Sequence, residues 1–574
     1  MKKTKPIGIF LFAAIAGLLI ACGPNRDPGE QRPPNGPRPF PETVFVWQAA
    51  GGRDHILFVQ AIQGIVARDA PQVYVMWNRP GNPFQRWLGL MEEKHGFTRV
   101  PVTDVWQLAD IFRHKFTGFV LYPEHNTETM NYAATLAGLL NALPVSERMR
   151  STAVARGWTQ VANAADYTSV QQIINRYGSE LNRTMFVNQR PQDEALRDFG
   201  IKHRAIIASP ANAEGLVPIF NFLNPNAQMF GWFSEGQGGE ILGLTQISAF
   251  NMGVFPADHA FNMSFLTDTT VRQHEQPRPI DWDLQAQPGK HYVAFVYADG
   301  DNIQWMYTDF PTSTNGFAHA NPNNIPMGWS IPPALTKFGP VILDYIYGNA
   351  RPRDNFVAGP SGYSYIFPSL FTNRQHLIEF GNLTAEFMRR SDLFYMEILD
   401  EHALRYDRIR DEDLEVFLRH DQIRGILYKT GSRYIGGRGF IRWVNNKPVV
   451  AFREALWNNR AGDLGVASES SRKRDAFEMA YRLSRYPKDH TSIDGYTLVT
   501  VHPWSHRFES VERIANWLSE NDPNVIIVTP ATLMRLIAEN VPRVNAQPVW
   551  HSATGGMGGS NWTYPPEIEA LWQP

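Results

Sequence analysis

Apolar and polar residues alternate along the C-terminal half in blocks that predict strands followed by helices. Residues 291–298 are mostly apolar, β-branched or aromatic and predict a buried strand, which ends at the turn Asp299-Gly300-Asp301-Asn302. Further strands are expected at residues 393–399, 425–428, 448–452, 496–501 and 524–528. Helices are expected at residues 334–349, 374–389, 471–485, 510–520 and 530–540, and a long Pro- and Asn-rich loop at residues 311–333. This alternation predicts parallel strands joined by right-handed crossovers.

The N-terminal half shows the same alternation. Residues 44–47 and 72–77 predict strands, and residues 54–67 between them carry apolar side chains at helical spacing, which together make a β-α-β unit. Further strands are expected at residues 118–122, 205–208 and 229–233, and helices at residues 103–113, 132–143 and 169–177. A polar stretch at residues 273–290 separates the two halves.

We therefore expect an α/β protein with two large domains. The first is an N-terminal α/β domain at residues 42–285, and the second is a (β/α) barrel-like domain at residues 286–574, with an open doubly wound sheet as the alternative to the barrel. No internal repeat is visible.

The segment before the first strand has the layout of an export signal. It begins with the basic run Met1 to Lys5, continues with apolar residues 7–20 and ends at Leu19-Ile20-Ala21-Cys22. These last four residues resemble a bacterial lipobox, which implies that residues 1–22 are a lipoprotein signal peptide and that Cys22 carries the lipid. The apolar run is short for a membrane span, so we expect a lipid anchor, with an uncleaved N-terminal anchor as the alternative.

Residues 23–41 are rich in Pro and Gly and predict an extended tether between the anchor and the folded body. The expected location is therefore the periplasm or the cell surface at the outer membrane. Cys22 is the chain's one cysteine, which excludes disulfides within the chain. A net charge of −2 gives no electrostatic footprint for nucleic acid.

Polar side chains follow three of the predicted C-terminal strands. These side chains are Asp299, Asp301, Glu397, Asp400, His502 and Trp504. In a barrel they would all face the rim formed by the carboxyl ends of the strands. Paired carboxylates at such a rim can act as acid and base, or as acid and nucleophile, in glycosidic cleavage. Carboxylates with imidazoles could also hold a divalent metal.

The His502-x-x-x-His506 spacing would suit zinc on a helix, because both imidazoles would share one face. Pro503 and Trp504 lie between the two histidines directly after a strand, so a helix is not expected. We interpret the segment as one histidine beside Trp504, whose ring can stack on a sugar. No metal ligand is assigned and no cofactor is expected, with a divalent metal kept as an alternative.

Residues 359–368 form the most distinctive segment, because two Gly and two Pro in Gly359-Pro-Ser-Gly-Tyr-Ser-Tyr-Ile-Phe-Pro368 impose an irregular backbone. Tyr363 and Tyr365 alternate, so their rings should point apart. One ring could line a cleft while the other packs inward.

This segment resembles the signature of the GxGYxYP family of putative glycoside hydrolases. Residues 362–368 lie on the naming motif without a gap, with Ser364 for the second Gly and Phe367 for the second Tyr. The resemblance extends over nearly the whole chain after the tether, through residues 57–65, 231–258, 299–302, 354–361 and 443–449. It implies an N-terminal α/β domain joined to a barrel-like C-terminal domain and a carbohydrate-related role. It assigns no catalytic residue.

Our first hypothesis is a lipid-anchored glycoside hydrolase acting on a poly- or oligosaccharide. Asp299 or Asp301 would pair with Glu397 or Asp400. The side chains expected to bind the sugar in the C-terminal domain are Asn302, Tyr363, Tyr365, His502 and Trp504. If the domain interface lies at the cleft, three acids of the N-terminal domain could reach it, namely Glu235, Glu240 and Asp258.

Two other classes remain open. One is a non-catalytic cell-surface lipoprotein that binds glycans through the same aromatic side chains. The other is a metal-dependent carbohydrate deacetylase or esterase, because the Asp299-Gly-Asp-Asn302 turn is similar to the strand-end Asp pair of polysaccharide deacetylases. No pair of histidines on a predicted helix accompanies that turn.

Overall fold

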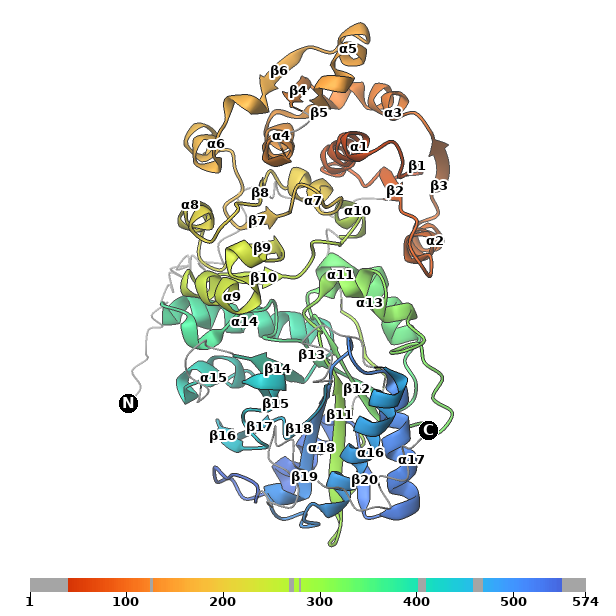
Figure 1. The fold of residues 1–574 in the computed structure, drawn as a ribbon, viewed down its shortest axis with the longest axis vertical. Helices are drawn as coiled ribbons and strands as arrows, with labels where there is room; N and C mark the ends of the chain where they lie inside the picture. The colour runs from red at the N-terminus through yellow and green to blue at the C-terminus, as the bar shows by residue number, and fades with distance from the viewer. Residues whose placement is uncertain are drawn as a thin grey trace, which may run out of the picture.

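The structure is a computed structural model that describes residues 40–123, 127–267, 273–277, 280–400, 409–457 and 468–549. Parallel strands alternate with helices, which confirms the predicted α/β class. The two halves of the chain are stacked along the long axis of the molecule, with the N-terminal half above the C-terminal half in Figure 1. Cys22 and the predicted tether before Phe40 lie outside the described residues.

The N-terminal half contains three small parallel sheets. The first, in the order β2-β1-β3, consists of β1 (Thr43–Gln48), β2 (Val73–Met76) and β3 (Thr98–Val102). The second, β5-β4-β6, consists of β4 (Gly118–Tyr122), β5 (Ala142–Ser146) and β6 (Gln160–Asn163). The third, β10-β9-β7-β8, consists of β7 (Met185–Asn188), β8 (Ile206–Ala208), β9 (Gln228–Gly231) and β10 (Gly253–Phe255).

Ten helices accompany these sheets in the described part of the half. They are α1 (Arg53–Val66), α2 (Pro83–His95), α3 (Val105–Ile111), α4 (Thr127–Leu140), α5 (Glu147–Ala155), α6 (Val170–Tyr177), α7 (Arg197–Lys202), α8 (Val217–Phe222), α9 (Gly239–Ala249) and α10 (Met263–Leu266). Helix α1 is buried along most of its length because it packs against α7 and β5. Gly64 permits this approach, since a Cβ there would lie 2.3 Å from the Asp198 carbonyl oxygen.

The C-terminal half is built on one ten-stranded sheet. Its order is β16-β17-β15-β14-β13-β12-β11-β19-β18, with β20 also paired to β11. The strands are β11 (His291–Tyr297), β12 (Met327–Ile331), β13 (Asp354–Ala358), β14 (Tyr395–Leu399), β15 (Gly425–Lys429), β16 (Ile441–Val444), β17 (Lys447–Ala451), β18 (Glu454–Leu456), β19 (Tyr496–Val501) and β20 (Val525–Ile527). All pairings are parallel except β16 with β17.

Two residues link β18, at one end of this sheet, to β17, the second strand from the other end. Strands β17 and β18 are separated by Phe452, whose amide donates to the Tyr428 carbonyl of β15, and Arg453, whose amide donates to the Leu498 carbonyl of β19. One stretch of backbone therefore pairs with β15 at its start and with β19 at its end. This connection is compatible with the predicted barrel-like arrangement.

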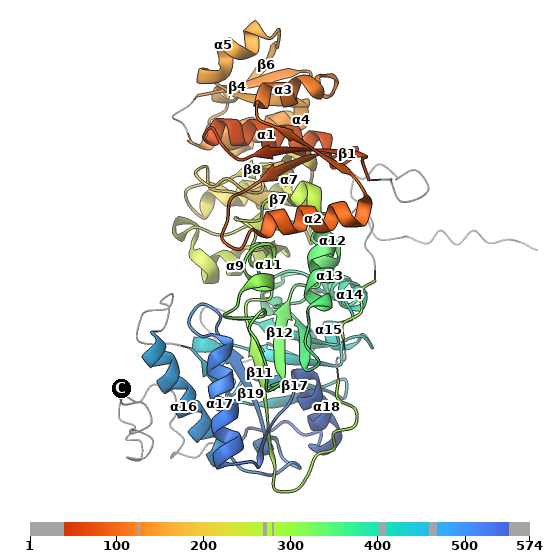
Figure 2. The same cartoon turned by 90° about the vertical axis from the view of Figure 1, so that its right-hand side faces the viewer.

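The helices of this half are α11 (Ile303–Tyr307), α12 (Leu335–Phe338), α13 (Pro340–Gly348), α14 (Arg374–Arg390), α15 (Asp411–Leu418), α16 (Glu469–Arg485), α17 (Phe508–Asn521) and α18 (Pro530–Asn540). Helices α16 and α17 lie on one side of the strands and α18 on the other (Figure 2). Among the described residues, none of the helices combines the length and the apolar character that crossing a membrane requires.

Three differences from the sequence prediction have a clear physical reason. The loop predicted at residues 311–333 contains strand β12, because Met327–Ile331 is fully buried between neighbouring strands although prolines flank it. The helix predicted at residues 334–349 is broken into α12 and α13 at Gly339 and Pro340, since Pro lacks the amide that would continue the helix. The helix predicted at residues 132–143 ends earlier, where Asn141 turns the chain with a φ of 51° into β5.

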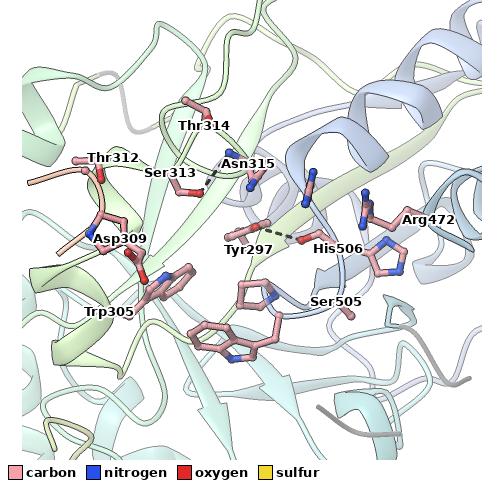
Figure 3. Close-up of a pocket in the computed structure, with 15 residues that line it drawn as sticks. Tyr297, Trp305, Asp309, Thr312, Ser313, Thr314, Asn315, Arg472, Ser505 and His506 are labelled. Carbon is pink, nitrogen blue, oxygen red and sulfur yellow. Dashed lines mark hydrogen bonds between the residues drawn. The ribbon is translucent and has the colours of Figure 1, made fainter. Parts of the chain in front are cut away.

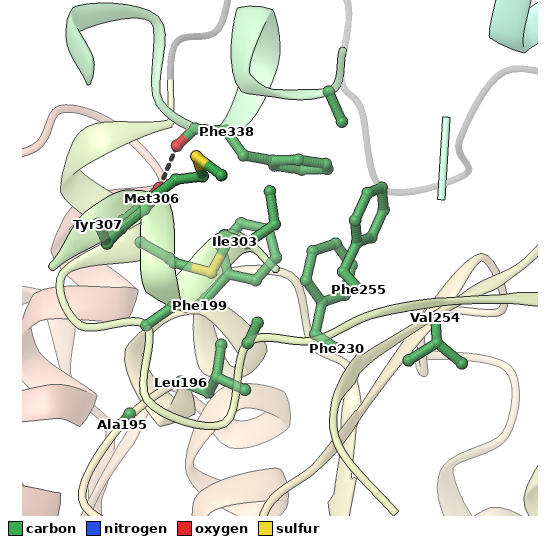
Figure 4. Packing of buried hydrophobic residues seen from close by; sticks show 14 of the residues in the cluster. Ala195, Leu196, Phe199, Phe230, Val254, Phe255, Ile303, Met306, Tyr307 and Phe338 are labelled. Carbon is green, nitrogen blue, oxygen red and sulfur yellow. Dashed lines mark hydrogen bonds between the residues drawn. The ribbon is translucent and has the colours of Figure 1, made fainter. Parts of the chain in front are cut away.

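The two halves share an apolar interface. Phe338 of α12 packs edge-on against Phe199, Phe230 and Phe255 of the N-terminal half, with ring centroids 6.0, 5.2 and 5.0 Å away (Figure 4). The Trp87 indole of α2 donates a 2.7 Å hydrogen bond to the Tyr307 carbonyl of α11. This packing resembles a domain core and holds the halves in one relative position.

Candidate active site

The first two acids of the candidate site follow β11. Asp299 takes a left-handed backbone conformation with φ 66°, and Gly300 lies directly against the end of β12. A Cβ at Gly300 would lie 2.1 Å from the Ser330 hydroxyl, and one at Gly359 would lie 2.3 Å from the Gly300 carbonyl carbon. The ends of β11, β12 and β13 therefore meet without side chains between them, which places Asp299 and Asp301 at the carboxyl rim of the sheet.

The third acid, Glu240, comes from the N-terminal half. Helix α9 carries it to the same place, where its Oε1 accepts a 3.0 Å hydrogen bond from the Tyr365 hydroxyl. Burial and the nearby Asp299 raise the pKa of Glu240 to about 7, against the lowering effect of the Tyr365 hydroxyl. We refer to Glu240, Asp299 and Asp301 as the rim acids.

The rim acids influence one another's protonation. Burial raises the pKa of Asp299, while the Trp504 indole and Lys429 act in the opposite direction. Burial, followed by the charges of Asp299 and Glu240, raises the pKa of Asp301 well above its ordinary value. All three side chains still keep part of their surface in contact with solvent. Burial and mutual repulsion therefore favour the protonated forms of these acids, and the site remains accessible to solvent.

The signature segment at residues 359–368 positions Glu240 by joining the two halves. Its Tyr365 exchanges backbone hydrogen bonds of 3.0 and 2.9 Å with Val254 of β10, and the Phe367 amide donates 2.9 Å to the Ser248 hydroxyl of α9. Gly253 leaves room for Ser364, whose hydroxyl would lie 2.2 Å from a Cβ at that glycine. The segment thus extends the third sheet and fixes α9 over the rim.

The two signature tyrosines point apart, as the alternation predicted. Tyr365 contacts Glu240, whereas the Tyr363 ring packs inward against Phe255 and Phe387, with centroids 5.3 and 4.5 Å away. Phe367 is fully buried, with its ring edge-on to Tyr365. The structure therefore places Tyr365 at the site and Tyr363 in the core.

Glu397, at the end of β14, occupies a different environment. Its Oε1 forms an ion pair with Lys429, 2.7 Å from the Nζ, but the angles of this contact are not those of a hydrogen bond. Its Oε2 accepts a 2.6 Å hydrogen bond from the Ser330 hydroxyl. Both charged side chains are almost completely buried. The Lys429 ammonium also lies 5.2 and 5.3 Å from the ring centres of Tyr434 and Phe452. The negative charge of Glu397 is thus compensated by the charge of Lys429.

Asp400 and Asn302 have local partners. Asp400 accepts hydrogen bonds of 2.9 and 2.8 Å from the amide and hydroxyl of Ser369, just after the signature segment. Asn302 caps α11, because its Oδ1 accepts a 3.0 Å hydrogen bond from the Trp305 amide. Both contacts organise backbone beside the rim acids.

Trp504 reaches the rim acids and His502 lies behind it. The Trp504 indole is 40% exposed and donates a hydrogen bond to Asp299. His502 is buried, stacks on Trp457 at 3.7 Å and contacts the Ser505 hydroxyl at 3.0 Å through Nδ1. Burial, His506 and Lys429 lower the pKa of His502 to about 3, so its imidazole is neutral. The segment from His502 to His506 forms a turn, as expected, and no helix.

Glu235 and Asp258 have other surroundings. Glu235 is exposed in a short turn before α9. The charged neighbours of Asp258 are His259, Asp193 and Arg190, all in the N-terminal half, and burial raises its pKa. Of the three N-terminal acids expected near the cleft, Glu240 is the one that the structure shows in contact with the signature segment.

A cavity of about 480 Å³ is lined mainly by residues 305–315 and 503–507 (Figure 3). The rim acids do not line it, but Trp504, which donates to Asp299, does. Trp305 and Trp504, whose ring centroids are 5.5 Å apart, line it together with Tyr297, and Pro80 and Gly81 contribute from the N-terminal half. Among the described residues, no group of three or more His, Cys, Asp or Glu side chains is arranged to hold a metal ion.

Sequence reasoning overlooked Lys429 and Ser330. Lys429 ends a strand of otherwise apolar residues, Gly425–Lys429, and a buried lysine at a strand end signals a charged partner on a neighbouring strand. Ser330 lies in the strand that was predicted as loop.

The chain belongs to the GxGYxYP family. The model of the "GxGYxYP putative glycoside hydrolase C-terminal domain" matches residues 289–538, that of the "GxGYxYP third domain" residues 182–268, and that of the "GxGYxYP_N 1st domain" residues 47–114. The C-terminal match covers β11, Asp299, Asp301 and the signature segment. The third-domain match covers α9 with Glu240.

A solved structure is similar over most of the chain. It is the crystal structure of a putative hydrolase from Bacteroides thetaiotaomicron, with 25% sequence identity and a TM-score of 0.74, and the alignment covers 89% of this chain and 96% of that one. No curated protein matches the sequence. The family and this structure together suggest a hydrolase that acts on glycosides.

Proposed function

We propose that the protein is a glycoside hydrolase whose catalytic groups are the rim acids. The observation that carries the proposal is the meeting of three carboxyl groups from two halves of the chain beside an exposed tryptophan and a cavity. Cleavage of a glycosidic bond needs one protonated and one ionised carboxyl group near the bond. In this proposal the rim acids supply both, because different neighbours act on their pKa values.

Glu240 is the proposed proton donor. Its pKa of about 7 lies near the pH at which a general acid is most effective, and the charge of Asp299 contributes to that value. Asp299 is the proposed ionised partner, because the Trp504 indole and Lys429 favour its carboxylate form. It would act as nucleophile or as base. Asp301, whose pKa is raised well above its ordinary value by burial and by the charges of Asp299 and Glu240, would remain protonated and donate a hydrogen bond to the sugar.

The other residues support this division of roles. Trp504 offers a partly exposed ring on which a sugar can stack while its indole holds Asp299. The Glu397–Lys429 ion pair lies behind the rim acids, where Lys429 favours the ionised form of Asp299. In this proposal Glu397 positions Lys429 and takes no part in proton transfer.

The test is sugar release from plant, host and microbial polysaccharides, with and without a chelator. We expect Glu240→Gln and Asp299→Asn to lower kcat at least about 100-fold. The control is Asp258→Asn, which changes a recessed acid outside the site and should leave kcat unchanged. With an aryl glycoside whose leaving group needs no protonation, Glu240→Gln should regain most of its activity and Asp299→Asn should not.

Other results would contradict the proposal. Retention on a glycan without any sugar release would favour the non-catalytic binding protein. Activity lost on chelation would favour a metal-dependent deacetylase or esterase.

We also propose that a lipid on Cys22 anchors the protein at the membrane, on the basis of the lipobox-like residues 19–22. Cys22→Ser should then move the protein from the membrane fraction to the soluble fraction of a cell lysate. An unchanged distribution would contradict the anchor.

A further inference from the structure

The cavity lined by residues 305–315 and 503–507 lies one side chain away from the candidate site. Trp504 donates its indole N–H to Asp299, and its ring, which is 40% exposed, lines the cavity. The ring on which the proposed function stacks a sugar is therefore also a wall of this cavity. A ligand in the cavity and a ligand at the rim acids would share Trp504.

A second tryptophan, Trp305, extends this aromatic wall. Its ring centroid lies 5.5 Å from that of Trp504, with 45° between the ring planes. Tyr297 and Phe310 pack against the other parts of Trp305, with centroids 6.1 and 5.0 Å away. The Trp305 amide donates a 3.0 Å hydrogen bond to the side chain of Asn302, so the turn that carries two of the rim acids also fixes the start of α11. The wall is thus held in place by the protein itself, which lowers the cost of ordering it around a ligand.

Polar side chains from the loop after α11 complete this part of the lining. They are Asp309, Thr312, Ser313, Thr314 and Asn315. The Asp309 carbonyl accepts hydrogen bonds of 3.2 and 2.8 Å from the amides of Thr312 and Ser313, which fixes the turn. The Asp309 side chain is exposed, and in the described part of the chain it forms no ion pair and no hydrogen bond. It lies on the same side of the cavity as Trp305 (Figure 3), where its carboxylate can accept hydrogen bonds from a ligand.

The charges around the cavity are mixed. Arg472 and Arg507 also line it, with Arg472 on the side away from Asp309 in Figure 3. Burial, followed by the charge of Arg507, lowers the pKa of Arg472. The charges of Glu509 and Glu469 act on that pKa in the opposite direction. Aromatic rings, hydroxyls, an amide and charges of both signs together suit an uncharged ligand with many hydroxyl groups, because each hydroxyl can donate and accept.

The size of the cavity also suits a small ligand. Its volume of about 480 Å³ falls within the range of about 300–1,000 Å³ that is usual for small-molecule sites. Pro80 and Gly81, in the loop between β2 and α2, line it from the N-terminal half, and a Cβ at Gly81 would lie 3.5 Å from the Thr312 hydroxyl. Both halves of the chain therefore contribute to the cavity, as both contribute to the rim acids.

We propose that this cavity is a subsite for an uncharged pyranose unit of the substrate. Trp305 and Trp504 would form the wall on which the ring of the sugar lies, and Asp309 would accept hydrogen bonds from its hydroxyl groups. The unit would be the neighbour of the sugar at the rim acids, since Trp504 borders the cavity and contacts Asp299. The substrate is then a neutral oligosaccharide or polysaccharide chain. This inference rests on the proposed function, because it names the substrate class of the same site.

The first test measures how cleavage depends on chain length and charge. Neutral oligosaccharides of the gluco, xylo, manno and galacto series, from disaccharides upward, are assayed beside the aryl glycoside of each sugar. We expect kcat/KM to rise about 10-fold or more from the aryl glycoside to a chain that also fills the cavity. Chains of the same length that contain uronic acids should be cleaved more slowly. A kcat/KM that does not depend on chain length, or faster cleavage of the uronic-acid chains, would overturn the subsite.

Variants of the lining test the individual contacts. Asp309→Ala changes an exposed side chain and should lower the ratio of kcat/KM for the longest chain to kcat/KM for the aryl glycoside about 10-fold. Trp305→Phe keeps an aromatic ring within the packing and should lower the same ratio by a smaller factor. The control Asp421→Ala removes an exposed acid outside the cavity lining and should leave the ratio unchanged. An equal loss on chain and aryl glycoside in Asp309→Ala, or a full ratio in both lining variants, would contradict the subsite.

A binding measurement separates this inference from the proposed function. Calorimetric titration of the same neutral oligosaccharides into Glu240→Gln, and into the double variant Glu240→Gln, Asp309→Ala, needs no turnover. Binding that weakens in the double variant, without cleavage of any glycan by the wild type, would support the subsite and refute the hydrolase. Cleavage of glycans with no dependence on Asp309 or Trp305 in binding or rate would support the hydrolase and refute the subsite. Neither binding nor cleavage of any chain would refute both.

Discussion

Two sets of carboxyl groups at the same rim have opposite surroundings. Glu397 is almost fully buried, but Lys429 supplies a counter-charge 2.7 Å from its Oε1 and the Ser330 hydroxyl donates a hydrogen bond to its Oε2. The rim acids keep some contact with solvent, yet like charges and burial dominate and raise the pKa of all three. Depth alone therefore does not decide how well the charge of an acid at this rim is compensated. The neighbouring charges decide it.

The contrast between Glu397 and the rim acids distinguishes an acid that supports the fold from acids that are proposed to act on a substrate. A buried acid with a counter-charge contributes to a rigid scaffold, whereas acids that lie close to each other without one cost stability. In the proposed function this cost keeps protons available for catalysis. Lys429 connects the two sets, because it pairs with Glu397 and also favours the ionised form of Asp299. The following predictions test the contrast, from the largest expected effect to the smallest.

Glu397→Gln should destabilise the C-terminal half by about 3–5 kcal/mol, because it leaves the Lys429 ammonium buried without a counter-charge. The midpoint of chemical denaturation, followed by tryptophan fluorescence, measures the effect. The double variant Glu397→Gln, Lys429→Met serves as the control and should recover much of the loss, since it buries no charge. A single variant as stable as the wild type would mean that the pair does not hold the rim.

Asp301→Asn should raise Tm by a few degrees at neutral pH. In the wild type the folded-state pKa is raised above the ordinary value of 3.8, so stability falls as pH rises from about 4 towards the folded-state pKa. Asn cannot ionise and avoids this loss. Thermal unfolding across pH should therefore show a gain that grows from pH 4 upward and is absent at lower pH. A gain of the same size at every pH would contradict a raised pKa at Asp301.

Asn302→Ala should lower stability by about 1 kcal/mol, the usual cost of losing a helix cap, because Asn302 caps α11. Asn302→Ser keeps a capping oxygen and should retain most of that stability. Denaturation midpoints measure both variants. If Asn302→Ala raised KM and left stability unchanged, Asn302 would be a substrate ligand, as the sequence first suggested.

Tyr365→Phe should shift the alkaline limb of the pH–activity profile upward by less than about one pH unit. In the wild type, activity should fall as pH rises through about 7, because Glu240, the proposed proton donor, then ionises. The Tyr365 hydroxyl stabilises the ionised form, so its removal should raise the pKa of Glu240 further. Tyr363→Phe removes a hydroxyl from the tyrosine that packs inward and should leave the limb in place. A downward shift in Tyr365→Phe would exclude Glu240 as the donor.

Local patterns predicted part of the regular elements, whereas several strands, among them β5, β7 and β13, were not predicted. The helix predicted at residues 530–540 is α18 (Pro530–Asn540), and the strand predicted at residues 291–298 is β11 (His291–Tyr297). The exceptions arise where tertiary packing outweighs local composition. Met327–Ile331 forms a central strand between prolines because neighbouring strands bury it on both faces.

The sequence could predict those parts of the candidate site that depend on neighbouring residues in the chain. Asp299 and Asp301 follow an apolar strand, so the sequence places them at a rim. Two other features depend on contacts between segments that are distant in the sequence. They are the ion pair of Glu397 with Lys429 and the position of Glu240 near Asp299. No spacing in the sequence encodes those contacts.

The backbone pairing of Val254 with Tyr365 also constrains how such a protein can be divided or recombined. If the C-terminal half were excised, it would lose Glu240 and the strand edge that holds the signature segment. An exchange of N-terminal halves between relatives would need a matching β10 and α9. The two halves therefore form one structural unit, although each has sheets of its own.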